Sequence, residues 1–156
     1  MKTAELKDSL AELAGQTATV VVFVANGCPT ARAYTDRLIA LHSEWAQRGV
    51  NVIAVNSNNP ALSPPDTPAE MAKRNFPFPY LKDEGGALAR SFDARVTPHA
   101  FLLDRDLSVV YSGRIDDSRL GDRITTRDLQ DAIAALVEGR PVPAARTEPF
   151  GCSIVW

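Results

Sequence analysis

The sequence predicts an α/β domain with a central mixed β-sheet flanked by helices, and three observations support this prediction. Two apolar, β-branched segments, residues 19–24 and 50–55, have the composition of strands that are buried on both faces. The residues between them have a helical pattern, so the unit is β–α–β, with parallel strands and a right-handed crossover. Further along, the apolar segments 99–103 and 107–111 flank a polar turn, which predicts an antiparallel hairpin. Parallel and antiparallel pairs together make the sheet mixed.

The first two helices are predicted from the spacing of apolar residues. Leu6, Leu10 and Leu13 share one helical face in a short amphipathic segment that Gly15 can end. A long helix follows the first strand, begins at a proline suited to the first helical position, and stops at Gly49. Its apolar face comprises Tyr34, Leu38, Leu41, His42 and Trp45.

Capping signals and prolines organise the second half of the chain. Residues 67–70 combine a capping box with proline at the first helical position, and residues 125–128 have the pattern of a second capping box. A short helix is expected over 86–92, and the second box opens a helix that Gly139 stops. Prolines favour an extended conformation over 76–81.

Length and composition indicate one globular domain. With 156 residues and 16.9 kDa, the chain is long enough to bury a core without disulfide or metal support. The net charge of −2 argues against nucleic acid as a partner. The longest apolar run, residues 20–25, is far shorter than the ~20 residues of a membrane span, and the N-terminal residues lack the features of a signal peptide. We therefore expect a cytoplasmic protein that binds neither nucleic acid nor a membrane.

The cysteines and histidines do not favour metal or cofactor chemistry. Two cysteines are too few for a disulfide scaffold, and the two histidines do not bracket them at zinc-ligand spacing. We expect no cofactor; a soft-metal site of Cys28, Cys152 and His99 is the weaker alternative. His42 is expected to pack at the core boundary. Strand alternation is expected to point His99 away from Cys28, although a closer His99 could relay a proton.

Cys28 is the residue whose position most strongly suggests chemistry. It lies between a buried strand and a helix, where functional groups collect at the carboxyl ends of strands in open α/β sheets. Backbone N–H groups and the helix dipole favour the thiolate there, and such thiols have pKa values of ~3.5–7.5 instead of ~8.5. A thiolate is a nucleophile, which indicates redox or covalent chemistry. The alternative is a buried, unreactive structural cysteine.

The sequence alone does not identify the thiol that would form a disulfide with Cys28. A Cys-x-x-Cys dithiol needs a cysteine at position 31, which is Ala31. The other cysteine, Cys152, lies in the proline-containing segment 140–156, which we expect to be a flexible tail. A tail thiol could pair with Cys28. Resolution by a small thiol, by a partner protein or by a second copy of the chain remains an alternative, as does an incidental Cys152.

Three other features have both a functional and a structural interpretation. Asn56, Asn58 and Asn59 follow the second strand near the expected cysteine site, and they either bind substrate or form turns. Trp156 is expected to pin the tail to the domain. The charged run 116–123 is expected to be a solvated loop.

Six short segments carry a family resemblance: residues 20–23 (VVVF), 26–29 (NGCP), 55–58 (VNSN), 96–98 (VTP), 113–117 (GRIDD) and 151–154 (GCSI). Together they resemble the thioredoxin superfamily and, more narrowly, the peroxiredoxin-like redoxins of the AhpC/TSA type. The likeness extends over nearly the whole chain from about residue 18 onward. It implies a single thioredoxin-like domain over residues 1–156, in which 140–156 is the cysteine-bearing tail.

The resemblance also implies roles for individual residues. Cys28 matches the nucleophilic cysteine of the superfamily, and Pro98 matches the cis-proline that faces it. Thr97 would offer backbone groups to a bound thiol or peptide. Arg114 matches a charged position, and we include it among the candidate catalytic residues because it could stabilise the thiolate or an anionic substrate. A surface salt bridge from Arg114 to Asp116 or Asp117 is the simpler interpretation.

Two departures from the family pattern concern the reaction. Typical peroxiredoxins carry a proline and a threonine before the reactive cysteine, in the order Pro-x-x-x-Thr-x-x-Cys. This chain has Val21 and Ala25 at those positions, so the hydroxyl that would orient a peroxide is missing. Ala31 likewise removes the second cysteine of a thioredoxin-type dithiol.

The sequence therefore predicts a thiol-dependent oxidoreductase that reduces peroxides or disulfides, with Cys28 as nucleophile and Cys152 as the resolving thiol. Its class would be a thiol-disulfide oxidoreductase or a peroxiredoxin-like antioxidant enzyme. The expected partners are a thiol reductant or a protein disulfide, and a homodimer is a further expectation. The alternatives are a non-catalytic module that senses redox state or binds a metal or partner, and a structural role with an unreactive Cys28.

Overall fold

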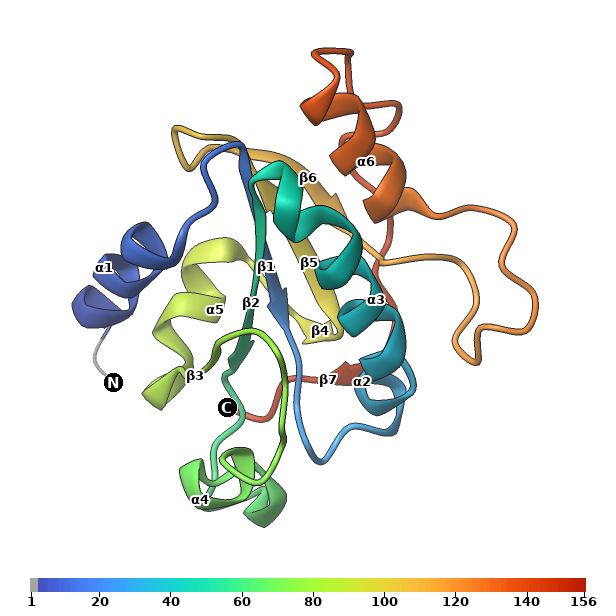
Figure 1. Ribbon diagram of the computed structural model, residues 1–156. Helices are drawn as coiled ribbons and strands as arrows, with labels where there is room; N and C mark the ends of the chain where they lie inside the picture. Colours follow the sequence, from blue (N-terminus) through green and yellow to red (C-terminus); the bar gives the residue numbers. More distant parts are fainter. Residues whose placement is uncertain (1–2) are drawn as a thin grey trace.

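The computed structural model describes residues 3–156, and its centre is a five-stranded sheet (Figure 1). The strand order is β3-β2-β1-β5-β6, with β1 parallel to β2, β2 parallel to β3, and the remaining pairs antiparallel. The predicted α/β class and mixed sheet are therefore confirmed. The strands are β1 (Ala18–Phe23), β2 (Val50–Asn56), β3 (Tyr80–Lys82), β5 (His99–Leu103) and β6 (Val109–Gly113).

Helices cover both faces of the sheet: α1 and α5 lie on one face, and α2, α3 and α6 lie on the other (Figure 1). Strand β1 has no exposed face, because its side chains alternate between the two layers. Val20 and Val22 pack toward α3 and α6, whereas Val21 and Phe23 pack toward α1 and α5. This explains the continuous apolar run. The helices are α1 (Thr3–Leu13), α2 (Pro29–Ala33), α3 (Thr35–Trp45), α4 (Pro68–Met71), α5 (Ala87–Phe92) and α6 (Asp128–Val137).

The long helix predicted after β1 is interrupted once. Tyr34 separates α2 from α3. Its backbone N–H donates to the carbonyl of Ala31, three residues earlier, which is the hydrogen-bond pattern of a 3₁₀ turn. The Tyr34 side chain is buried, and its hydroxyl donates to the carboxylate of Asp116 at 2.9 Å. The helix ends as expected through a 3₁₀ turn (Ala46–Arg48) at Gly49, which is left-handed with φ +79°.

Two predictions in the loop before α6 were wrong. The expected second capping box does not form, because Thr125 binds Asp117 through its backbone N–H and its hydroxyl, and α6 begins without a side-chain cap. The run 116–123 is also not wholly solvated. Asp116 is buried, where it accepts hydrogen bonds from Tyr34 and Arg37 and forms an ion pair with Arg37 at 2.8 Å. Capping at the first box is confirmed, since the hydroxyl of Thr67 accepts from the Glu70 N–H.

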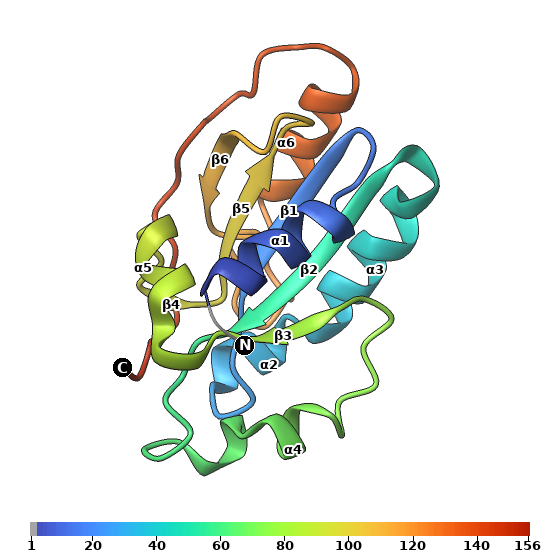
Figure 2. The same cartoon turned by 90° about the vertical axis from the view of Figure 1, so that its left-hand side faces the viewer.

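The C-terminal segment runs down the outer edge of the molecule, past β6 and α5 (Figure 2), and its last strand then passes below the lower end of the sheet (Figure 1). Its strand β7 (Cys152–Ser153) pairs antiparallel with β4 (Val96–Thr97). Trp156 adds contacts at the end: the Arg90 guanidinium lies 4.3 Å from its ring, and Asn59 donates to its carbonyl. These contacts show where the C-terminal segment packs when Cys28 and Cys152 are joined in a disulfide. The flexibility of this segment and the single-domain organisation stay predictions.

Within residues 3–156, none of the helices is both long and apolar enough to cross a membrane.

Candidate active site

Cys28 follows β1 by a short loop and caps the N-terminus of α2. Its backbone is extended, with φ −103° and ψ 112°, and Pro29 occupies the first helical position. The Cys28 Sγ accepts the N–H of Ala31 at 3.3 Å, and the carbonyl oxygen of Thr97 lies 3.3 Å from the same sulfur. Only 1% of the residue is exposed. The sulfur is therefore held between a helix N-terminus and the segment before Pro98.

The structure joins Cys28 to Cys152 in a disulfide. The two Cα atoms lie 5.9 Å apart, within the ordinary range for such a bond, and the cysteines are separated by 124 positions in the chain. Strand β7 brings Cys152 there, because its register places Cys152 opposite Thr97. Of the pairings that the sequence left open, the structure has the intramolecular one.

The peptide bond between Thr97 and Pro98 is cis, in agreement with the family resemblance. Thr97 is buried, and its backbone faces both cysteines: its carbonyl lies beside Cys28, and its strand pairs with Cys152. Four of the five candidate residues, Cys28, Cys152, Thr97 and Pro98, are thus brought together. Their catalytic roles stay predictions.

Gly151 permits the close approach of the tail to this segment. A Cβ atom at this position would overlap the Thr97 carbonyl oxygen, so no other residue fits without moving the tail. We expect Gly151→Ala to displace β7 and to lower the fraction of protein with the 28–152 disulfide at a fixed thiol–disulfide ratio, measured by mass spectrometry of trapped samples. Gly85→Ala is the matched control, because a Cβ at this left-handed glycine meets nothing within 4 Å. Equal disulfide fractions in both variants would contradict this role.

Arg114, the fifth candidate, lies away from these contacts. Its Nε donates to the Asp128 carboxylate at 2.7 Å, and its guanidinium also reaches Thr126. The expected ion pair with Asp116 or Asp117 was wrong, since the partner in the structure is Asp128. The Asp128 hydrogen bond also raises the pKa of Arg114. Among residues 3–156, the side-chain hydrogen bonds of Arg114 are with Thr126 and Asp128 and not with either cysteine, so a role in the reaction stays a prediction.

A buried polar network behind Cys28 was not foreseen from the sequence. Its centre is Asp66, which has no exposed surface and lies in a 3₁₀ turn (Pro64–Asp66). The carboxylate accepts from the backbone N–H of Asn26 at 2.6 Å and from the side-chain amides of Asn56 and Asn58 at 2.8 and 3.0 Å. Burial alone would raise the pKa of Asp66, but hydrogen bonds, the largest from Ser63, lower it.

Lys82 extends this network from β3. Lys82 is buried, and its ammonium group donates to the side chain of Asn56 at 3.0 Å and to the backbone carbonyls of Asn58 and Asp66 at 2.6 and 2.7 Å. Burial lowers the pKa of Lys82, which the negative charge of Asp66 opposes. The ammonium therefore has hydrogen-bond acceptors for its three protons and does not point freely toward a substrate.

The same network holds the segments on both sides of the disulfide. Asn26 lies two residues before Cys28 and binds Asp66, while Asn58 accepts the backbone N–H of Val155 at 2.9 Å. Asn59 in turn donates its N–H to the carbonyl of Val155 at 2.7 Å. For Asn56, Asn58 and Asn59, the sequence left both substrate binding and turn formation open. In the structure, their side chains form hydrogen bonds with the protein itself.

His99 faces the layer opposite to Cys28, as expected. Its ring stacks on Phe101 at 4.4 Å between centroids, and Phe101 belongs to the cluster on the α1 and α5 face. The ring nitrogens contact the N–H of Arg95 and the hydroxyl of Ser112. The soft-metal set of His99 with both cysteines therefore does not come together, and no other group of three potential ligands occurs among the described residues.

His99 predicts a pH dependence of stability. Burial lowers the pKa of His99 from 6.5 to about 4, so the unfolded chain binds more protons than the folded chain between these values. The free energy of unfolding should therefore fall by about 2–3 kcal/mol as pH drops from 7 to 4. Urea unfolding across this range measures it. His99→Asn should remove this part of the pH slope, and an unchanged slope in the variant would contradict the assignment.

Together, the mixed sheet, the cis-proline and the cysteine that caps α2 define a thioredoxin-like fold with a disulfide where β1 leads into α2. Peroxiredoxin Q from Xanthomonas campestris shares this fold, with a TM-score of 0.57 and 23% identity, over 83% of this chain and 83% of that chain. The AhpC/TSA family model matches residues 2–112, more than half of the sequence. The chain belongs to the AhpC/TSA family.

Two solved structures are more similar. An uncharacterized conserved protein from Geobacillus kaustophilus is 38% identical, with a TM-score of 0.87 over 94% of this chain and 81% of that chain. A hypothetical protein from Sinorhizobium meliloti 1021 is 33% identical, with a TM-score of 0.86 over 94% of this chain and 84% of that chain. Among curated proteins, none matches significantly.

Proposed function

We propose that this protein is a thiol-dependent oxidoreductase in which Cys28 is the nucleophile and Cys152 resolves the product as an intramolecular disulfide. The observation that carries this proposal is the pairing of the two cysteines beside the cis Thr97–Pro98 bond. Membership of the AhpC/TSA family supports thiol-dependent redox chemistry. The disulfide form described here is the oxidised product of the cycle.

The chemistry balances for a disulfide substrate. The Cys28 thiolate attacks one substrate sulfur, which forms a mixed disulfide and releases the first thiolate. The Cys152 thiolate then attacks the Cys28 sulfur, which closes the 28–152 bond and releases the second thiolate. An external dithiol reduces this bond and regenerates both protein thiols while it becomes a disulfide itself. The absence of a hydroxyl at Ala25 favours this substrate over a peroxide.

Peroxide reduction is the second candidate, and family membership favours it. In that reaction the Cys28 thiolate attacks a peroxide oxygen, so that an S–O bond forms, the O–O bond breaks and an alcohol or water leaves. The Cys152 thiol then attacks the sulfur of the Cys28 sulfenic acid. The disulfide closes, and the hydroxyl group of the sulfenic acid leaves as water. An antioxidant role in the cytoplasm, and a homodimer, belong to this candidate as further proposals.

Cysteine variants test the two roles separately. Reduced protein is treated with one equivalent of hydrogen peroxide or of an organic disulfide and then analysed by mass spectrometry. The parent chain should lose two hydrogens and yield a crosslinked 28–152 peptide pair, and Cys152→Ser should accumulate the adduct on Cys28. Cys28→Ser should lose turnover with both oxidants. Turnover at the parent rate in Cys28→Ser would refute the assignment, and oxidation without turnover would favour the redox-sensing alternative.

A further inference from the structure

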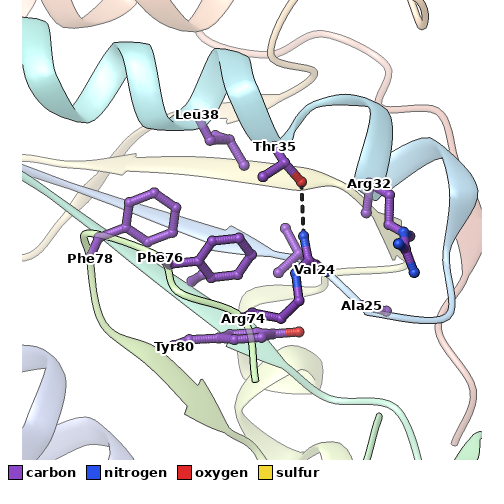
Figure 3. Close-up of a pocket in the computed structure, with 11 residues that line it drawn as sticks. Val24, Ala25, Arg32, Thr35, Leu38, Arg74, Phe76, Phe78 and Tyr80 are labelled. Carbon is purple, nitrogen blue, oxygen red and sulfur yellow. Dashed lines mark hydrogen bonds between the residues drawn. The ribbon is translucent and has the colours of Figure 1, made fainter. Parts of the chain in front are cut away.

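A small pocket of about 10 Å³ lies near the loop that carries Cys28, between α2 and α3 on one side and the segment before β3 on the other (Figure 3). Ala31 lines this pocket and also donates its N–H to the Cys28 sulfur. In Figure 3 the Arg74 side chain lies between Thr35 and Tyr80, with Phe76 and Phe78 to one side and Arg32 to the other. The pocket is therefore aromatic on one side and basic at the end near the cysteine loop.

Arg74 has only neutral hydrogen-bond partners here. Its guanidinium donates to the side-chain oxygen of Asn26 at 3.2 Å and to the hydroxyl of Thr35 at 3.1 Å, and it lies 4.7 Å over the ring of Phe76. These contacts fix its plane without neutralising its charge. A guanidinium carries five N–H donors, so these two bonds leave Arg74 with further N–H groups that can donate to an anion.

Two further arginines lie at α2, the helix whose N-terminus Cys28 caps. Arg32 donates to the backbone carbonyl of Asn26 at 3.4 Å, and Arg119 donates to the hydroxyl of Thr30 at 3.1 Å. Both are exposed. None of the three arginines forms an ion pair with a carboxylate in the part of the chain that the structure describes. The nearby Asp66 is buried and already accepts from its own donors.

Three arginines without an ion-pair partner among residues 3–156 thus contact residues on either side of Cys28, at Asn26 and Thr30. Such a basic rim raises the local concentration of negatively charged ligands. We propose that Arg32, Arg74 and Arg119 select an anionic reaction partner, so that the small disulfide that exchanges with Cys28 carries a carboxylate. This inference rests on the proposed function and names its substrate class. The exchange itself is the balanced sequence given above, in which the two substrate thiolates are the leaving groups.

Two aromatic disulfides of different charge test the proposal. Reduced protein is mixed with 5,5′-dithiobis(2-nitrobenzoate), which carries two carboxylates, or with neutral 4,4′-dithiodipyridine, and the thiol released is followed by absorbance. We expect the rate ratio of the anionic to the neutral probe to fall about tenfold in Arg32→Ala/Arg119→Ala. The ratio in the parent chain should also fall with added salt, a measurement that needs no variant. Arg105→Ala removes the same charge from the exposed turn after β5 and should leave the ratio unchanged.

An unchanged ratio in the double variant, or no salt dependence in the parent chain, overturns the anion selection while the exchange activity stands. The double variant leaves Arg74 in place, because Arg74 also holds the segment before β3. Failure of Cys28 to react with either probe overturns the proposed function instead, and the anion selection falls with it.

Discussion

Cys152→Ser is expected to lower the free energy of unfolding by about 3–5 kcal/mol relative to the oxidised protein. The 28–152 bond joins positions 124 residues apart, so it removes many conformations from the unfolded chain. Its loss also removes the covalent link that holds β7 beside β4. Denaturant unfolding of the oxidised parent and of the variant, at the same pH, measures the difference.

Reduced parent protein is the control for this prediction. If the bond itself is the source of stability, the reduced parent and Cys152→Ser should unfold at closely similar denaturant concentrations. A variant that is as stable as the oxidised parent would show that the tail contacts, such as those of Ile154, hold the C-terminus without the bond. A variant far less stable than the reduced parent would show a role for the Cys152 side chain beyond the bond.

Asp66→Ala is expected to lower the free energy of unfolding by about 3–5 kcal/mol. The substitution leaves the amides of Asn26, Asn56 and Asn58 without their shared acceptor, and all three are buried. It also removes the negative charge that offsets the buried ammonium of Lys82. Chemical unfolding followed by circular dichroism measures the change.

Asp106→Ala supplies the matched control, because this exposed carboxylate lies in the turn between β5 and β6. Its substitution should change stability by no more than about 0.5 kcal/mol. Similar effects of the two substitutions would mean that net charge, and not the buried network, sets the stability. Because Asp66 also holds the loop before Cys28, its substitution should slow disulfide exchange in the protein that remains folded.

Much of the fold could be predicted from local patterns. The central strand β1 is apolar at every position because both of its faces are covered, and this leaves a clear signal in the sequence. The hairpin of β5 and β6 was equally evident, since a polar turn separates two apolar segments. The interruption at Tyr34 had no such signal, because a contact with Asp116, far along the chain, holds that side chain.

The polar part of the site lay outside what one sequence can show. Asn26, Asp66 and Lys82 come from three distant segments, and each alone has the pattern of an ordinary loop or surface residue. Their shared burial depends on how β2 and β3 pack against the loop after β1. Similarly, Cys28 was evident from its position after a strand, whereas its partner depended on the two-residue strand that carries Cys152.

The most direct test follows the two sulfurs through reduction and reoxidation in the folded protein. The oxidised chain is treated with dithiothreitol without denaturant, its fold is checked by circular dichroism, and one equivalent of an organic disulfide or of peroxide is then added. We predict that the 28–152 bond opens while the fold persists and closes again within one turnover, as shown by trapped peptide masses. A bond that opens only when the chain unfolds would show that it is purely structural and would contradict the redox cycle.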